Sequence, residues 1–187
     1  MPLHHDLNPG FHGQAPEPID RNLQKLARTV VEKNCDVGLA NDGDADRIGM
    51  YDERGEFVDS HRMLALLVKY LHEEKGLSGE VVKTFSTTEM LDRMGEHYGL
   101  PVNTTKIGFK YIADVLNQIE ANGAYREIRG TVDDFVLGIE ESHGYLAGTH
   151  VRDKDGAVAA LLACELAARL KADRQTLHEK LDALFWQ

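Results

Sequence analysis

Cysteine and long apolar runs are scarce in this chain, and each shortage excludes a class of protein. The two cysteines, Cys35 and Cys164, stand far apart with no CxxC or histidine spacing nearby. This argues against a disulfide framework or a zinc motif and predicts reduced thiols in or near the core. No apolar run approaches ~20 residues and no signal-peptide pattern appears, so we expect a cytoplasmic protein without a membrane span.

Positive charge is also in short supply. The 187 residues contain 21 Lys and Arg against 31 Asp and Glu, which gives a formal net charge of −10. Such a chain repels phosphate backbones and anionic membranes, so neither a nucleic acid nor a membrane is expected as a partner. Apolar residues make up 42% of the sequence, enough for one large core or two small ones. A small-molecule ligand is the better expectation.

Proline is nearly confined to one region, since four of the five prolines lie in the first eighteen residues, which predicts an irregular lead-in. Beyond it, hydrophobic periodicity alternates between that of helices and that of strands. Helices are expected at 19–33, 62–74, 88–98, 109–122, 156–171 and 174–185, and strands at 36–40, 48–51, 57–58, 80–85, 101–105 and 135–140. This order predicts an α/β fold, a layered sheet with flanking helices, mostly parallel or mixed. A boundary near 58–61 would divide the chain into domains at 1–58 and 59–187.

The most informative motif is the run NDGDADR at 41–47, which follows an apolar strand. Asp42, Asp44 and Asp46 alternate in a tight loop, so their carboxylates can face one point and form a Mg²⁺ site. Arg47 adds a fixed positive charge, as expected where a phosphate completes the coordination. Two alternatives remain: a calcium EF-hand loop, although Arg47 occupies its required glycine position, and a solvated acidic turn.

A second polar segment, GIEESHGY at 138–145, follows a predicted strand. Glu140 and Ser142 are two residues apart and could bind vicinal sugar hydroxyls, with glycines that allow backbone to approach a ligand. The alternative is a polar cluster that only forms a turn or caps a helix. Downstream, the segment VRDKDG at 151–156 brings cations to the start of a helix, where Asp155 is expected as the N-cap.

Together these segments resemble the α-D-phosphohexomutase superfamily (phosphoglucomutase/phosphomannomutase), more closely its phosphoglucomutase branch. The metal loop NDGDADR, the sugar loop GIEESHGY, GTHVRDKDG, TKIGFKYI and VVKTFSTTEML occur in the family's order. The resemblance implies that the chain covers the second half of domain 2, with the metal loop, and domain 3, which recognises the sugar.

The resemblance also implies roles for single residues. Asp42, Asp44 and Asp46 would be the metal ligands, and Arg47 would lie beside the phosphoserine. Glu140 and Ser142 would bind sugar hydroxyls, and the Gly108 backbone would approach the substrate. Lys83 and Lys154 would act near the transferred phosphate, as contacts or as acid and base, and either could be the acting lysine.

Two of the family's motifs do not occur in the sequence: a serine loop of the TASHNP type and a phosphate loop like RxSGTEP. The chain is therefore expected to be an inactive part of a Mg²⁺-dependent mutase that interconverts hexose 1-phosphate and hexose 6-phosphate through a phosphoserine and a bisphosphate intermediate. Its truncated half-domain is expected to promote self-association. A non-catalytic module that binds Mg²⁺ or sugar phosphate, and a DxD-type phosphatase, are the alternative functions.

Overall fold

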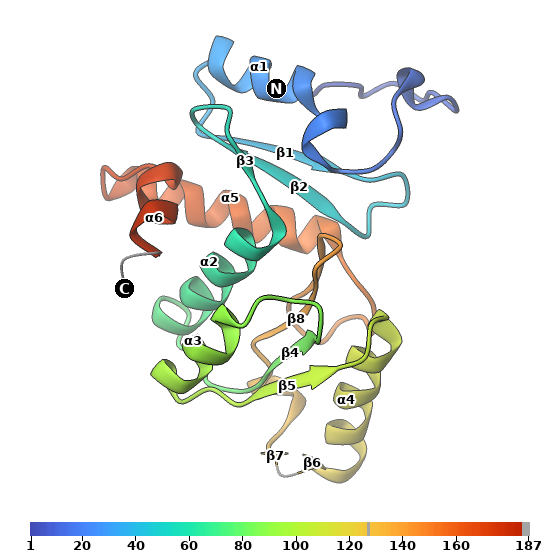
Figure 1. Cartoon of the computed structure of the whole chain (residues 1–187), viewed down its shortest axis with the longest axis vertical. Coiled ribbons are helices and arrows are strands. Elements are labelled where there is room, and N and C mark those ends of the chain that lie inside the picture. The colour runs from blue at the N-terminus through green and yellow to red at the C-terminus, as the bar shows by residue number, and fades with distance from the viewer. Residues whose placement is uncertain (127, 185–187) are drawn as a thin grey trace.

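A computed structural model describes residues 1–126 and 128–184, and its helices and strands build two larger sheets joined by long helices, together with a short two-stranded ribbon (Figure 1). The first sheet contains β1 (Val37–Asn41), β2 (Ile48–Asp52) and β3 (Phe57–Val58), all antiparallel in the order β1-β2-β3. Helix α1 (Gln24–Glu32) covers one face of this sheet and α5 (Gly156–Ala172) covers the other. The sheet with the acidic loop is thus one layer between two helices.

The second sheet has the order β5-β4-β8-β9. Strand β4 (Val81–Thr84) runs parallel to β5 (Val102–Thr105) and to β8 (Leu137–Glu140), while β9 (Gly144–Leu146) returns antiparallel to β8. Helices α2 (Ser60–Glu73), α3 (Met90–Tyr98), α4 (Phe109–Asn122) and α6 (Leu177–Leu184) complete the α/β layers. The predicted α/β fold is confirmed, and the sheet is of the mixed kind.

Sequence signals explain why the helices begin and end where they do. Asp59 caps α2, because its side chain accepts the Arg62 N–H at 3.0 Å. Helices α3 and α4 end at Gly99 and Gly123, which have φ values of 68° and 66° and so adopt the left-handed conformation that glycine tolerates. Ten residues of α2 are buried, including Leu64 and Leu67, which makes this helix the centre of the larger core.

Most predicted elements are confirmed, with four corrections. The helix expected at 19–33 is a 3-10 turn (Asp20–Asn22) followed by the shorter α1, and the last helix begins at Leu177 instead of 174. The strand expected from 135 begins at 137, because the 3-10 turn Val132–Asp134 precedes it with a capping box. The segment 138–145, expected as a loop after the strand, is a tight hairpin of β8 and β9. The expected end of the last helix, residue 185, lies outside the described residues.

Several smaller features were not anticipated. A two-stranded ribbon pairs β6 (Ala124–Tyr125) with β7 (Ile128–Arg129) beyond the end of α4, and a 3-10 turn lies at Phe11–Gly13 in the otherwise irregular lead-in. Both cysteines are free, but only Cys35 is partly buried; Cys164 is exposed on α5, so its expected position near the core was wrong. Among the described residues, no helix is long and apolar enough to span a membrane.

Candidate functional site

The acidic loop connects β1 to β2 and is organised by its own arginine. The Asp42 side chain is fully buried and accepts two hydrogen bonds from Arg47, one from the backbone N–H at 3.1 Å and one from Nε at 2.6 Å. Burial alone would raise the pKa of Asp42, but these hydrogen bonds lower it below its ordinary value. Strands on both sides of the loop exclude an EF-hand, which requires helices there.

The loop residues have the donors and the geometry for a divalent cation. Asp42, Asp44 and Asp46 each offer a carboxylate oxygen, and these oxygens lie within 4.8 Å of one another. Asp46 Oδ1 is buried and makes no hydrogen bond; it forms an ion pair with Arg47 Nε at 3.4 Å, so it retains acceptor capacity for a cation. Burial raises the pKa of Asp46, and the neighbouring Asp42 raises it further. Three clustered carboxylate oxygen donors fit a hard cation such as Mg²⁺.

Lys154 connects this loop to the second sheet. Its ammonium lies 2.8 Å from Asp46 Oδ2 and 3.7 Å from Glu140 Oε2, and the side chain is only 18% exposed. Although burial opposes it, the hydrogen bond to Asp46 and the charges of both carboxylates raise the pKa of Lys154. Lys154 is therefore held as a cation between the acidic loop and Glu140.

Glu140 ends β8 and is buried, with each of its carboxylate oxygens in a defined contact. Oε1 accepts the Gly108 N–H at 3.1 Å, and Oε2 accepts the Ser142 hydroxyl at 3.1 Å. Gly108 precedes α4 with a φ of 117°, a conformation that favours glycine, and this turns its N–H toward the carboxylate. The hairpin therefore presents Glu140, Ser142 and Gly108 as one hydrogen-bonded group.

The two sheets meet directly at this site. Arg47 forms an isolated antiparallel bridge with Gly144, and the Ile48 N–H donates to the His143 carbonyl at 3.2 Å. On the other side the Gly156 N–H donates to the Ala45 carbonyl at 3.2 Å. A Cβ at Gly156 would lie 2.8 Å from the carbonyl oxygens of Ala45 and Arg47. Only glycine therefore allows the start of α5 to approach the acidic loop so closely.

The structure brings together eight of the nine residues expected in the site. They are Asp42, Asp44, Asp46 and Arg47 on the acidic loop, Lys154 before α5, and Gly108, Glu140 and Ser142 on the second sheet. The ninth, Lys83, is buried on β4, and its ammonium donates to Asp92 on α3 at 2.5 Å and to the Thr88 carbonyl at 3.2 Å. Lys83 thus binds α3 rather than the acidic loop.

Sequence reasoning expected the glycines of 138–145 to let backbone approach a ligand, but it did not anticipate that Gly144 and Gly156 make room for neighbouring parts of the site. A Cβ at Gly144 would lie 2.3 Å from Cδ of Lys154, so this glycine provides the space that the lysine occupies. Gly156 does the same for the acidic loop. A glycine directly before or after a polar motif was the available signal. Asp155 caps α5 as predicted, because its carboxylate accepts the Val158 N–H at 2.9 Å.

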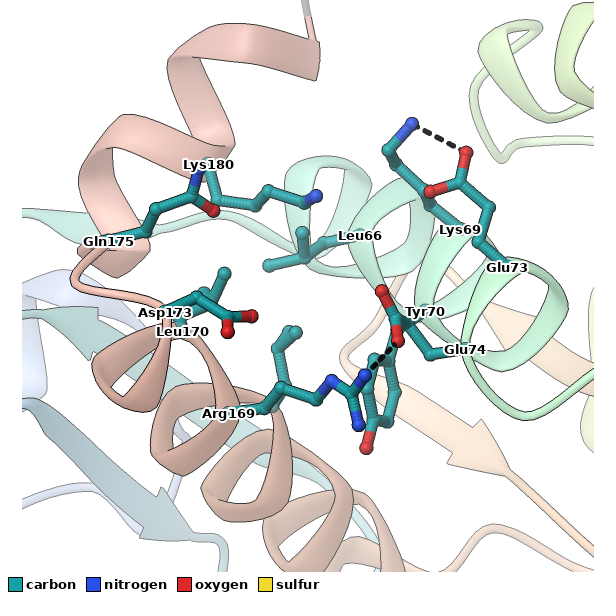
Figure 2. Close-up of a pocket in the computed structure, with 11 residues that line it drawn as sticks. Leu66, Lys69, Tyr70, Glu73, Glu74, Arg169, Leu170, Asp173, Gln175 and Lys180 are labelled. Carbon is teal, nitrogen blue, oxygen red and sulfur yellow. Dashed lines mark hydrogen bonds and ion pairs between the residues drawn. The ribbon is translucent and has the colours of Figure 1, made fainter.

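A small cavity lies away from these residues, between α2, the end of α5 and α6 (Figure 2). Its volume is about 100 Å³, and two ion pairs lie at its wall, Lys69 with Glu73 and Arg169 with Glu74, both at 2.8 Å. None of the nine expected site residues lines it. The clustered carboxylates, lysine and glycine turns therefore remain the candidate site.

These features define an α/β protein with an acidic, lysine-bridged site at the contact of two sheets. Comparison with known proteins is consistent with this. Residues 59–186 match the family model described as phosphoglucomutase/phosphomannomutase, alpha/beta/alpha domain III, and residues 1–55 match the model of domain II. The chain belongs to the phosphoglucomutase/phosphomannomutase family, as the sequence motifs indicated.

Relatives of known name give the same result. A phosphoglucomutase/phosphomannomutase of Thermococcus kodakarensis is 31% identical over 85% of this chain, and a probable phosphoglucosamine mutase of Pyrococcus horikoshii is 33% identical over 86%. The crystal structure of a putative phosphomannomutase from Thermus thermophilus is 33% identical, with a TM-score of 0.77 over 95% of this chain and 37% of that chain. The chain spans about a third of the length of these relatives. The branch of the family stays a prediction.

Proposed function

We propose that this chain supplies the metal loop and the sugar-recognition loop of a phosphohexomutase. In the proposed reaction a phosphoryl group moves between O1 and O6 of a hexose, through a phosphoserine and a bisphosphate intermediate. The observation that carries the proposal is the position of Lys154, whose ammonium contacts Asp46 on the acidic loop and Glu140 on the hairpin. The acidic loop, which would bind the metal and the phosphate, and the hairpin, which would bind sugar hydroxyls, are therefore both in contact with Lys154.

Asp42, Asp44 and Asp46 are the residues that would hold Mg²⁺. When bound there, the ion supplies positive charge that stabilises the transferring phosphoryl group. Arg47 is the fixed cation of the loop, and because it is already bound to Asp42 it is oriented before a ligand arrives. Asp46 Oδ1, which is buried and makes no hydrogen bond, supports the metal assignment.

We assign the phosphate-facing lysine to Lys154 rather than Lys83. Lys154 is a cation between the acidic loop and the hairpin, where it can neutralise phosphoryl oxygens or transfer a proton to the departing hydroxyl. Lys83 is held by Asp92 and by the Thr88 carbonyl, and would have to break both contacts to reach the loop. Lys83 then serves to position α3 on the sheet.

Glu140 and Ser142 are the proposed contacts for the sugar. The Ser142 hydroxyl donates to Glu140 Oε2, so an arriving sugar hydroxyl can take over that acceptor while the serine donates elsewhere. The Gly108 N–H holds the other oxygen and fixes the direction of the carboxylate. Glucose, mannose and glucosamine phosphates all remain candidate substrates, and a cytoplasmic location stays a prediction from the sequence.

Metal binding can be tested on the 187-residue polypeptide. Calorimetric titration with Mg²⁺ is expected to show a weak site, because three carboxylates leave the remaining positions to water. Asp44 is exposed, so Asp44→Asn should abolish this site without disturbing the fold. Asp133→Asn, an exposed aspartate on the second sheet's side of the chain, is the matched control and should bind as the parent does. Equal binding in both variants would contradict the assignment.

Turnover provides the second test. Without a phosphoserine donor the 187 residues alone should not convert glucose 1-phosphate to glucose 6-phosphate, even with Mg²⁺ and glucose 1,6-bisphosphate. Joined to domains that carry a serine loop and a phosphate loop, the polypeptide should do so, and Glu140→Gln should lower the kcat of that protein roughly 10- to 100-fold, as expected for a charge-assisted hydrogen bond of about 1.5–3 kcal/mol. Burst release of phosphate from an aryl phosphate by the polypeptide would instead favour a phosphatase.

A further inference from the structure

A second group of metal-binding side chains lies on the opposite end of the β2–β3 hairpin from the acidic loop. Asp52 ends β2, Glu56 precedes β3, and His178 lies in the first turn of α6. One donor atom from each, two carboxylate oxygens and an imidazole nitrogen, lies within 4.8 Å of the others. We propose that these three residues form a site for a transition-metal dication, with Zn²⁺ as the best match.

The spacing of the donor atoms matches a tetrahedral site. His178 Nδ1 lies 2.9 Å from Asp52 Oδ2 and 3.7 Å from Glu56 Oε2. Around Zn²⁺, with bonds of about 2.0–2.1 Å, tetrahedral donor atoms lie roughly 3.3 Å apart. These two distances lie on either side of this value, and the third pair of donor atoms lies within 4.8 Å. The 2.9 Å contact is a hydrogen bond, which the ion would replace as the side chains adjust. Three protein donors leave a fourth position for water.

The remaining atoms of these residues are already held in the orientation that a metal requires. Asp52 is 1% exposed, and its Oδ1 accepts the N–H groups of Arg54 at 3.0 Å and Glu56 at 2.9 Å, which leaves Oδ2 facing His178. His178 Nε2 lies 3.3 Å from Asp182 Oδ2, one turn along α6. A carboxylate on the distal nitrogen fixes the ring of a metal-bound histidine and keeps its proton away from the metal.

The donor chemistry separates this site from the acidic loop. The loop offers only carboxylates, which suit Mg²⁺, whereas an imidazole with two carboxylates favours Zn²⁺ and similar ions. Four acidic groups approach His178, since the Glu53 carboxylate also accepts its backbone N–H at 3.2 Å. Nearby Arg54 and Arg62 compensate only part of this charge, through Glu53 at 4.0 Å and Asp182 at 3.9 Å.

An ion at this position would join two parts of the chain. Asp52 and Glu56 belong to the hairpin of the first sheet, and His178 belongs to α6, which packs against α2. Because all three ligands come together only in the folded protein, Zn²⁺ should bind the native state and stabilise it. The proposal does not depend on the mutase assignment, since it concerns different residues and a different ion.

The test is zinc binding by the 187-residue polypeptide in excess Mg²⁺, which occupies the acidic loop. His4, His5 and His12 near the amino terminus can also bind zinc, because the rings of His4 and His12 lie 4.0 Å apart. These three histidines are therefore first replaced by alanine. In this background, calorimetry should show one Zn²⁺ site, and Co²⁺ should give the visible absorption of a tetrahedral complex.

Substitutions of the ligands decide the outcome. His178→Ala should remove the site, and Asp182→Asn should weaken it roughly 10- to 100-fold. Glu56→Gln should also weaken it while preserving the fold, because this side chain is 58% exposed. His97→Ala, which replaces an exposed histidine on α3, is the matched control.

Zinc should raise Tm in the background protein but not in His178→Ala. Unchanged zinc affinity in both His178→Ala and Glu56→Gln, or no binding in the background protein, would overturn the proposal.

Discussion

Lys154 lies between Asp46 and Glu140, and by contacting both carboxylates it connects the acidic loop of the first sheet to the hairpin of the second. This contact has a cost for metal binding, because a cation beside Asp46 competes with a metal for the same carboxylate. The Lys154 ammonium and a bound dication should therefore compete for the Asp46 carboxylate.

Replacing this lysine should therefore strengthen metal binding. Lys154→Met preserves the apolar stem and removes one positive charge next to a metal ligand. A unit charge about 4 Å from a dication contributes on the order of 2 kcal/mol at a solvated site, so Mg²⁺ affinity should rise roughly 30-fold. Calorimetric titration measures this directly. Lys171→Met removes an exposed lysine that pairs with Asp36 and should leave the affinity unchanged. Equal or weaker binding in Lys154→Met would contradict this competition.

The contact between α5 and the acidic loop should be sensitive to a single methyl group. In Gly156→Ala the new Cβ would lie 2.5 Å from Asn41 Nδ2 and 2.8 Å from two backbone oxygens, and backbone cannot yield as a flexible side chain can. Overpacking of this kind costs about 1–3 kcal/mol of unfolding free energy, and movement of the loop should weaken Mg²⁺ binding as well. Urea unfolding and calorimetry measure the two effects. Gly130→Ala, where the nearest atom is 3.5 Å away, is the control.

Local signals explain how much of the fold could be read from the sequence. Helix α4 was predicted to its observed ends, because an apolar face and the glycine at each end agree. The hairpin β8–β9 was missed because its turn is a polar run in which His143 has a φ of 67°, a left-handed conformation without a glycine to indicate it. Where turn chemistry departs from the usual residues, periodicity cannot show that the chain reverses.

In the site, too, local features could be predicted from the sequence, whereas contacts set by tertiary packing could not. Alternating aspartates lie within a few residues of one another, so their spacing predicted the clustering of carboxylates that the structure shows. The partners of the two lysines depend on how the elements pack. Lys83 meets Asp92 because α3 lies against β5, the neighbour of β4, whereas Lys154 meets Asp46 because α5 packs against β1. Only the tertiary arrangement distinguishes these two lysines, and residue type gave no indication of it.

Stability at low pH should depend on the cap of α5. The hydrogen bond from His150 at 2.8 Å, together with the Val158 N–H, lowers the pKa of Asp155. Because the folded pKa is the lower one, this stabilisation is present above the unfolded pKa of about 4 and is lost as the pH falls below it. At neutral pH, Asp155→Asn should lower Tm by roughly 1–4 °C, because its cap lacks the charge.

That difference should shrink as the pH falls from about 5 to 3, when the parent carboxylate takes up its proton. Thermal unfolding followed by circular dichroism across this range measures it. Asp114→Asn, an exposed aspartate in the middle of α4, is the control and should show no comparable pH-dependent difference. A constant gap in Tm between the parent and Asp155→Asn at every pH would show that the charge of the cap contributes nothing.

The last prediction concerns β1. In the described part of the chain this strand pairs only with β2, so its outer edge presents backbone groups to which another strand could bind. We expect the polypeptide to self-associate through this edge, with sedimentation velocity showing a dimer whose fraction rises with concentration.

Ala40→Lys should shift the dimer to monomer, because an edge lysine opposes strand addition. Ala40 borders a hollow of about 640 Å³ against the lead-in, which has room for the lysine. Ala121→Lys, exposed near the end of α4, should leave the dimer intact. A monomer at all concentrations would exclude the edge as an interface.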